Sequence, residues 1–189
     1  MQKSSFFIDH YLKKISQSHS KSLTPLARRY LTDLIYALLE EYALSIDEIL
    51  LKYHKKTVTE KEIEMVTNIL FSEDISLFAI AKGSKAVMHY QSQQQKPHKT
   101  KTSTEIKAGI LLSVSKIRSQ FCKFLFYKPY RISKRAMIML TTICQYILTE
   151  ILENIKESKI DKKHIVDYIQ SDQDLLKSLS KSKLGNLCQ

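Results

Sequence analysis

Residues 24–63 read TPLARRYLTDLIYALLEEYALSIDEILLKYHKKTVTEKEI, and this stretch decides the fold. It opens on Thr24-Pro25, a pair typical of a helix start because threonine caps the first amides and proline already has a helical φ angle. Apolar side chains then recur at steps of three and four from Leu31 to Ile49. The spacing predicts an amphipathic helix that runs to about Tyr53 and needs a partner helix to cover its stripe.

Other helices are expected on both sides of this long one. Thr59-Glu60-Lys61-Glu62 has the form of a capping box, which opens a helix. The predicted segments of the first half are a short helix through Phe7, Tyr11 and Ile15, a polar loop over Ser16–Ser22, the long helix, a basic loop over His54–Thr57, a third helix through Ile63, Val66, Ile69 and Leu70, and a fourth helix over Glu73–Tyr90.

The same order of elements then recurs. Residues 91–103, rich in Gln, Lys and Thr and containing Pro97, are predicted to be a flexible linker. The second half is expected to hold a short helix over Val114–Leu125, a loop over Phe126–Ile132, a long helix capped by Ser133, and a third helix capped by Asp161 that contains Ile165 and Ile169. The chain thus divides into units 1–90 and 104–180 and a short tail, 181–189, and the two units are expected to pair with each other.

Composition indicates an all-α protein with a polyanionic partner. Three Gly and three Pro among 189 residues provide few of the turns that sheets need. The net charge of +11 is concentrated in the second half, since residues 1–91 carry 12 Lys+Arg against 11 Asp+Glu and residues 92–189 carry 18 against 8. Nucleic acid is the favoured partner and an anionic membrane the second.

Insertion in a membrane and secretion are not expected. Apolar runs such as Ala136–Leu140 are far shorter than a membrane span, and Phe6-Phe7-Ile8 is followed at once by charged Asp9. A helix bound to a membrane surface would carry its basic residues on one side, whereas the long helix has mixed charge at Glu40-Glu41 and Asp47-Glu48.

Catalysis and metal binding have little support. The six histidines form no HExxH or similar spacing, and the chain has no Gly-rich phosphate loop. Cys122, Cys144 and Cys188 have no CxxC spacing, and Cys144 is predicted to lie in the core of a helix. A dyad of Cys122 or Cys144 with His164 is conceivable, but isolated Cys and His on helices are far more often packing residues. We expect no enzyme, no cofactor and no metal site.

The local sequence resembles core histones. Lys55 to Ile63, and Gly83-Ser84-Lys85-Ala86-Val87 with Tyr90, match the pattern of a two-B-type histone. The second half resembles a two-A-type histone at Ala108-Gly109, Arg131, Tyr146, residues 150–153, His164, and Asp172 with Asp174. The chain is therefore similar to the fused histone doublets of large DNA viruses of eukaryotes. The resemblance implies two tandem histone folds, a short, a long and a short helix each, paired within one chain.

The resemblance also implies a function and a set of sites. A doublet of this kind would wrap double-stranded DNA with histones of types three and four, in chromatin of a host nucleus or viral factory and inside a virion if the source is viral. The first loop of each half would lie beside the second loop of the other and face phosphates. The expected DNA-binding residues are Thr24, Lys55, Lys56, Thr57, Lys116, Arg118, Arg131, Lys134, Lys159 and Lys162.

The acidic residues and the function each allow two interpretations. Asp74, Glu150, Glu153, Asp172 and Asp174 match the acidic patch on which histone pairs bind partner proteins, but a scattered solvated face is about as good an interpretation. The alternative function is a histone-fold subunit of a transcription-factor complex, which would use the same helices for protein assembly. Such subunits generally lack the paired basic loops that this chain has.

Overall fold

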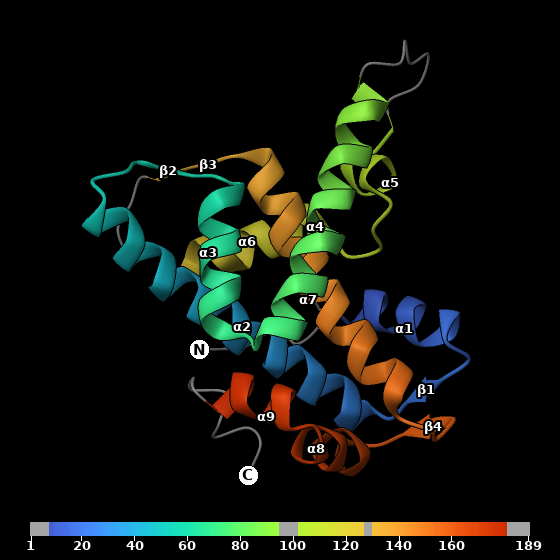
Figure 1. The fold of residues 1–189 in the computed structure, drawn as a ribbon. Coiled ribbons are helices and arrows are strands. Elements are labelled where there is room, and N and C mark those ends of the chain that lie inside the picture. The colour runs from blue at the N-terminus through green and yellow to red at the C-terminus, as the bar shows by residue number, and fades with distance from the viewer. Residues whose placement is uncertain (1–7, 95–101, 127–129, 181–189) are drawn as a thin grey trace.

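The computed structural model describes residues 8–94, 102–126 and 130–180, with side chains given as far as residue 176. Helices account for 77% of these residues, which confirms the expected all-α class. Figure 1 shows the helices stacked across one another. Within the described residues, short strands form two separate two-stranded sheets. The expected tail, 181–189, and most of the expected linker, 95–101, lie outside the described residues.

The first half forms four helices and two short strands. Thr24 caps the long helix by accepting a hydrogen bond from the amide of Ala27, and Thr59 with Glu62 forms the expected capping box. The elements are α1 (Asp9–Ser18), β1 (Ser22–Leu23), α2 (Pro25–Lys52), β2 (Thr57–Val58), α3 (Glu60–Leu70) and α4 (Glu73–Gln94).

The second half repeats this order after one extra turn of helix. Ser133 caps its long helix through the amide of Ala136, and Asp161 forms a capping box with His164. The elements are α5 (Thr104–Ala108), α6 (Val114–Phe124), β3 (Arg131–Ile132), α7 (Lys134–Asn154), β4 (Lys159–Ile160), α8 (Lys162–Ser171) and α9 (Gln173–Ser180).

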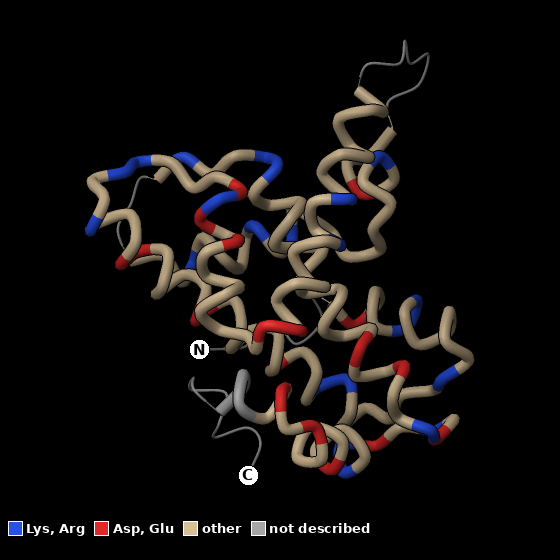
Figure 2. Tube along the Cα trace, viewed as in Figure 1, with Lys and Arg blue, Asp and Glu red and all other residues tan. Residues whose placement is uncertain are grey.

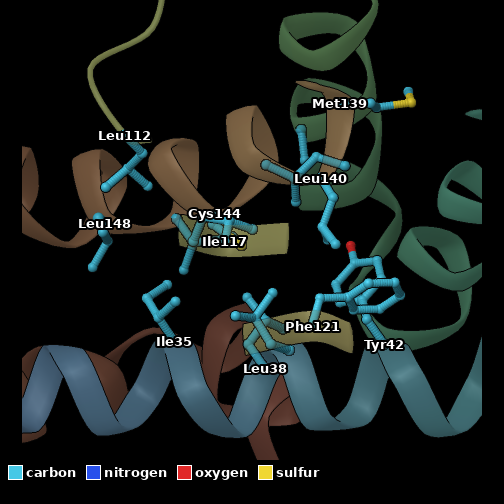
Figure 3. Packing of buried hydrophobic residues seen from close by; sticks show 14 of the residues in the cluster. Ile35, Leu38, Tyr42, Leu112, Ile117, Phe121, Met139, Leu140, Cys144 and Leu148 are labelled. Atoms are coloured by element: carbon cyan, nitrogen blue, oxygen red, sulfur yellow. The ribbon is translucent and has the colours of Figure 1, made fainter. Parts of the chain in front are cut away.

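One hydrophobic core joins the two halves. Figure 3 shows Ile35, Leu38 and Tyr42 of α2 pointing toward α7, with side chains of α6 between the two long helices. Tyr42 is completely buried there and its hydroxyl lies 2.8 Å from that of Thr67 in α3. Along the other side of α7 lies α4, and Gly83 allows their close approach. Each half therefore completes the core of the other.

Two element boundaries differ from expectation. Helix α1 continues through Ser18 into the expected loop, and the hydroxyls of Ser16 and Ser18 donate hydrogen bonds to the carbonyls of Lys13 and Ile15. Helix α4 continues to Gln94, so the start of the expected linker is helical. The Gln94 amide donates a 2.6 Å hydrogen bond to the hydroxyl of buried Tyr90, which ties this extra turn to the core.

The expectation about apolar length also needs correction. Helix α7 has 21 residues and a window of mean hydropathy 1.3, so by length and composition it is able to cross a membrane. Within that window 72% is buried inside the protein. Its apolar character is accounted for by its central place in the core, where helices are apolar all round.

Candidate nucleic-acid interface

Two pairs of short parallel strands connect the halves, and each pair carries part of the predicted interface. Strand β1 pairs with β4, with Ser22 opposite Lys159, and β2 pairs with β3, with Thr57 opposite Arg131. Figure 1 shows the two pairs on opposite sides of the molecule. We call residues 22–24 with 158–162 the β1–β4 junction, and residues 55–60 with 131–135 the β2–β3 junction.

The β1–β4 junction joins the N-termini of α2 and α8. The amides of Ser22 and Thr24 donate to the carbonyls of Ser158 and Ile160, at 2.7 and 3.0 Å. The Thr24 hydroxyl, besides capping α2, donates a 2.7 Å hydrogen bond to the carboxylate of Asp161, which caps α8. This bond lowers the pKa of Asp161. Both helices thus begin side by side, with the partly positive ends of their dipoles together.

The β2–β3 junction repeats this arrangement with α3 and α7. The amides of Arg131 and Ser133 each donate a 2.9 Å hydrogen bond, to the carbonyls of Lys56 and Val58. The Ser133 hydroxyl approaches Glu60 at 3.3 Å, and Arg135 forms a 2.7 Å ion pair with the same carboxylate. Sequence reasoning missed Arg135 and Glu60, because charges in the first turn of a helix are usually solvated.

Eight of the ten predicted DNA-binding residues lie at these junctions. Lys116 and Arg118 are exposed on α6 instead, where Lys116 lies close to Tyr11 of α1. Figure 2 shows Lys and Arg following the loops of the β2–β3 junction. The β1–β4 junction holds Thr24, Lys159 and Lys162, and the β2–β3 junction holds Lys55, Lys56, Thr57, Arg131 and Lys134.

Lys55 has a second role that the sequence did not reveal. Its Nζ donates a 2.6 Å hydrogen bond to Glu62, a carboxylate whose side chain is only 1% exposed. Burial raises the pKa of such a carboxyl, but hydrogen bonds from Lys55 and from Thr59 outweigh burial and lower the pKa of Glu62 to about 2. Lys55 therefore neutralises a buried charge although its own side chain is exposed, and Lys56 beside it is exposed as well.

Three tyrosines that sequence reasoning missed lie under predicted DNA-binding lysines, of which Lys134 and Lys162 belong to the junctions and Lys116 does not. The ammonium groups of Lys116, Lys134 and Lys162 lie over the rings of tyrosines in the first half. The helical spacing of these tyrosines indicates that they lie in the core. The neighbouring sequence does not indicate which lysine each ring contacts. The pairs are Lys116 with Tyr11, Lys134 with Tyr90, and Lys162 with Tyr30.

Three of the five predicted acidic-patch residues converge on two tyrosines. Burial, together with the negative charges of Glu150, Asp172 and Glu153, raises the pKa of Tyr146 to about 12. Asp172 accepts a 3.1 Å hydrogen bond from the Tyr168 hydroxyl, and Glu153 lies 3.3 Å from His19 of the other half. The carboxylates of Glu150 and Asp172 therefore act on both Tyr146 of α7 and Tyr168 of α8.

The other two acids mark helix starts. Asp74 and Asp174 lie in the first turns of α4 and α9, where negative charge interacts well with the helix dipole. Asp172 itself caps α9 by accepting the amides of Asp174 and Leu175. These contacts give part of the acidic set a structural role.

The described residues contain no group of three or more His, Cys, Asp or Glu placed to hold a metal ion. Cys144 is completely buried in the core, as predicted, and burial raises the pKa of its thiol to about 12. His164 accepts the amide of Asp161 in the capping box, so its imidazole has a structural partner.

No protein-family model matches the chain, and no curated protein matches it.

Proposed function

We propose that this chain is a structural DNA-packaging protein, in which two tandem histone folds pair within one molecule and wrap duplex DNA together with histones of types three and four. Its place would be the chromatin of a host nucleus or viral factory, and the virion interior if the source is viral. The observation that carries the proposal is that both inter-half junctions bring basic loops and helix N-termini together.

The repeat of elements supports the histone-fold part of the proposal. In each half a short helix leads into a two-residue strand, a long capped helix, a second two-residue strand and a third helix that begins with a capping box. The first strand of each half pairs with the second strand of the other. Two units with separate cores would not pair their strands with each other in this reciprocal way.

The chemistry of the junctions supports a phosphate partner. Each junction joins the start of one long helix to the start of one third helix, so backbone amides and dipole ends lie together. Exposed cations flank them, Lys159 and Lys162 at one junction and Lys56 and Arg131 at the other. Such a surface attracts the DNA backbone without reading its sequence.

Salt dependence of DNA binding tests the proposal. We expect tight binding with little sequence preference, and an affinity that falls linearly with salt on logarithmic axes. Lys56→Ala is expected to reduce that slope by about 1, whereas Lys82→Ala, an exposed lysine on α4, serves as the matched control. Arg131→Ala is expected to weaken wrapping more than any single lysine change, because a guanidinium suits insertion into a narrow minor groove.

The pair Lys55 and Lys56 sharpens this test. The Lys55 ammonium is hydrogen-bonded to Glu62. We therefore expect Lys55→Ala to lower the free energy of unfolding, and to change the salt slope less than Lys56→Ala does. Replacing both lysines with alanine should flatten the dependence of DNA affinity on salt. A slope that is unchanged in all of these variants, or binding confined to one DNA sequence, contradicts the proposal and favours a protein-assembly role.

A further inference from the structure

Three lysines of the second half lie over tyrosine rings of the first half. The Nζ atoms of Lys116, Lys134 and Lys162 lie 5.4, 5.2 and 5.5 Å from the ring centroids of Tyr11, Tyr90 and Tyr30. These distances fall within the roughly 6 Å over which an ammonium is attracted to the face of an aromatic ring. Every one of these contacts crosses from one half to the other.

The rings are fixed while the lysines reach solvent. Tyr30 and Tyr90 are each 4% exposed, and Tyr11 is half-buried against the core. All three lysines are exposed. A packed ring has one orientation, so the ammonium that lies over it is held in place, whereas the four-carbon chain of a free surface lysine samples many rotamers.

All three lysines lie in the first turn of a helix, where a positive charge is disfavoured. Lys134 and Lys162 are the first residues of α7 and α8, and Lys116 is the third residue of α6. A cation in the first turn is repelled by the positive end of the helix dipole. The electron-rich face of a tyrosine opposes that repulsion and keeps the charge beside the helix start.

We infer that Tyr11, Tyr30 and Tyr90 are positioning residues, which hold the DNA-binding lysines of the opposite half in their binding orientation. The inference rests on the proposed function, since it concerns how the same interface is built. It makes the affinity for the phosphate backbone depend on rings that do not touch DNA. Pairing of the halves and formation of the binding surface are then one event.

Double-variant cycles on the full chain separate this role from ordinary packing. Tyr30→Leu is expected to weaken binding of a random-sequence duplex about two- to fivefold and to leave the salt slope unchanged, because the lysine charge remains. Lys162→Ala is expected to reduce the slope by about 1. The double variant should bind like Lys162→Ala alone, and Tyr30→Phe should restore affinity because its ring is retained.

Controls exclude a loss of folded protein. Melting temperatures are measured for each variant, and Tyr11→Leu with Lys116→Ala repeats the cycle at a half-buried ring whose truncation is less disruptive. Tyr36→Leu is the control. Tyr36 lies on α2 like Tyr30, but its ring packs edge-on against Phe124 of the other half, with 6.5 Å between the ring centroids. It should leave affinity unchanged.

The possible outcomes distinguish the inference from the proposed function. If the lysine variants weaken binding but the tyrosine variants do not, or if the tyrosine and lysine effects simply add, the inference is overturned and DNA binding stands. If the lysine variants leave affinity and slope unchanged while Lys56→Ala reduces the slope, the inference fails and DNA binding stands. If Lys56→Ala leaves the slope unchanged as well, the DNA-binding proposal fails and the inference fails with it.

Discussion

Glu62 shows at the scale of one residue how a charge is held inside this protein. It lies in the first turn of α3, accepts hydrogen bonds from the hydroxyl and amide of Thr59, and forms an ion pair with Lys55. A buried carboxylate is tolerated only when its oxygens are satisfied in this way. The group therefore fixes the start of α3 and the conformation of the basic loop before it.

The stability of the protein should report on this carboxylate. The folded pKa of Glu62, about 2, lies below its ordinary value of 4.5, so its contribution is complete above pH 4.5 and is lost as the pH falls toward 2. We expect Glu62→Gln to lower the free energy of unfolding by about 1–3 kcal/mol at pH 7 and to flatten its pH dependence in that interval. Urea unfolding at several pH values measures both.

Glu64→Gln provides the control, because Glu64 lies on the same helix and is only half-buried. It should keep the pH dependence of the original protein. Identical pH profiles for the two variants would show that Glu62 is not the group responsible.

At the scale of elements, the packing of α4 against α7 depends on one glycine. A Cβ atom at Gly83 would lie 2.9 Å from Cγ of Met139. We expect Gly83→Val to lower the free energy of unfolding by about 1–3 kcal/mol, because the two helices or the methionine must shift. Thermal or urea unfolding measures the change, and Ser84→Val at the next, half-buried position is the comparison.

The cause of that loss is testable in the same background. With Met139→Ala added, the combined cost should be smaller than the sum of the single costs, because the truncated side chain leaves room for the valine. If the two costs in unfolding free energy are strictly additive, the valine does not destabilise the protein through Met139, and its effect lies elsewhere, for instance on the backbone of α4.

Helix starts were predictable from sequence and helix ends were less so. Thr24, Thr59, Ser133 and Asp161 cap the helices that their side chains predict, because capping is local chemistry within four residues. Helix α4 extends past the expected Tyr90 to Gln94, the last described residue of this segment, and the Gln94 amide donates a hydrogen bond to the hydroxyl of Tyr90 one turn earlier.

At the scale of the whole molecule, the shared core predicts that the halves stay together without a covalent link. Side chains of α2, α6 and α7 bury one another, so neither half keeps its core alone. We expect proteolytic cleavage within residues 95–101 to leave both fragments in one particle, measured by size-exclusion chromatography with light scattering. Two separate, folded fragments would contradict intramolecular pairing.

The loops of the candidate interface could be found from the sequence, but not their partners. Lys55, Lys56 and Arg131 are recognisable as basic loop residues, and the junctions contain them. The neutralisation of Lys55 by Glu62, and the rings under Lys116, Lys134 and Lys162, arise from side chains that only the packing of the helices brings into contact. Local pattern contains no information about such contacts.

The two junctions also imply an order of assembly during folding. Ser133 and Glu60 are 73 residues apart in the chain, whereas Thr24 and Asp161 are 137 apart. The longer loop costs about 0.5 kcal/mol more in closure entropy, and during synthesis the partner of β1 leaves the ribosome last. We therefore expect the β2–β3 junction to form first and the β1–β4 junction to close the molecule. In pulse-labelling hydrogen exchange, the amide of Ser133 should gain protection before that of Thr24.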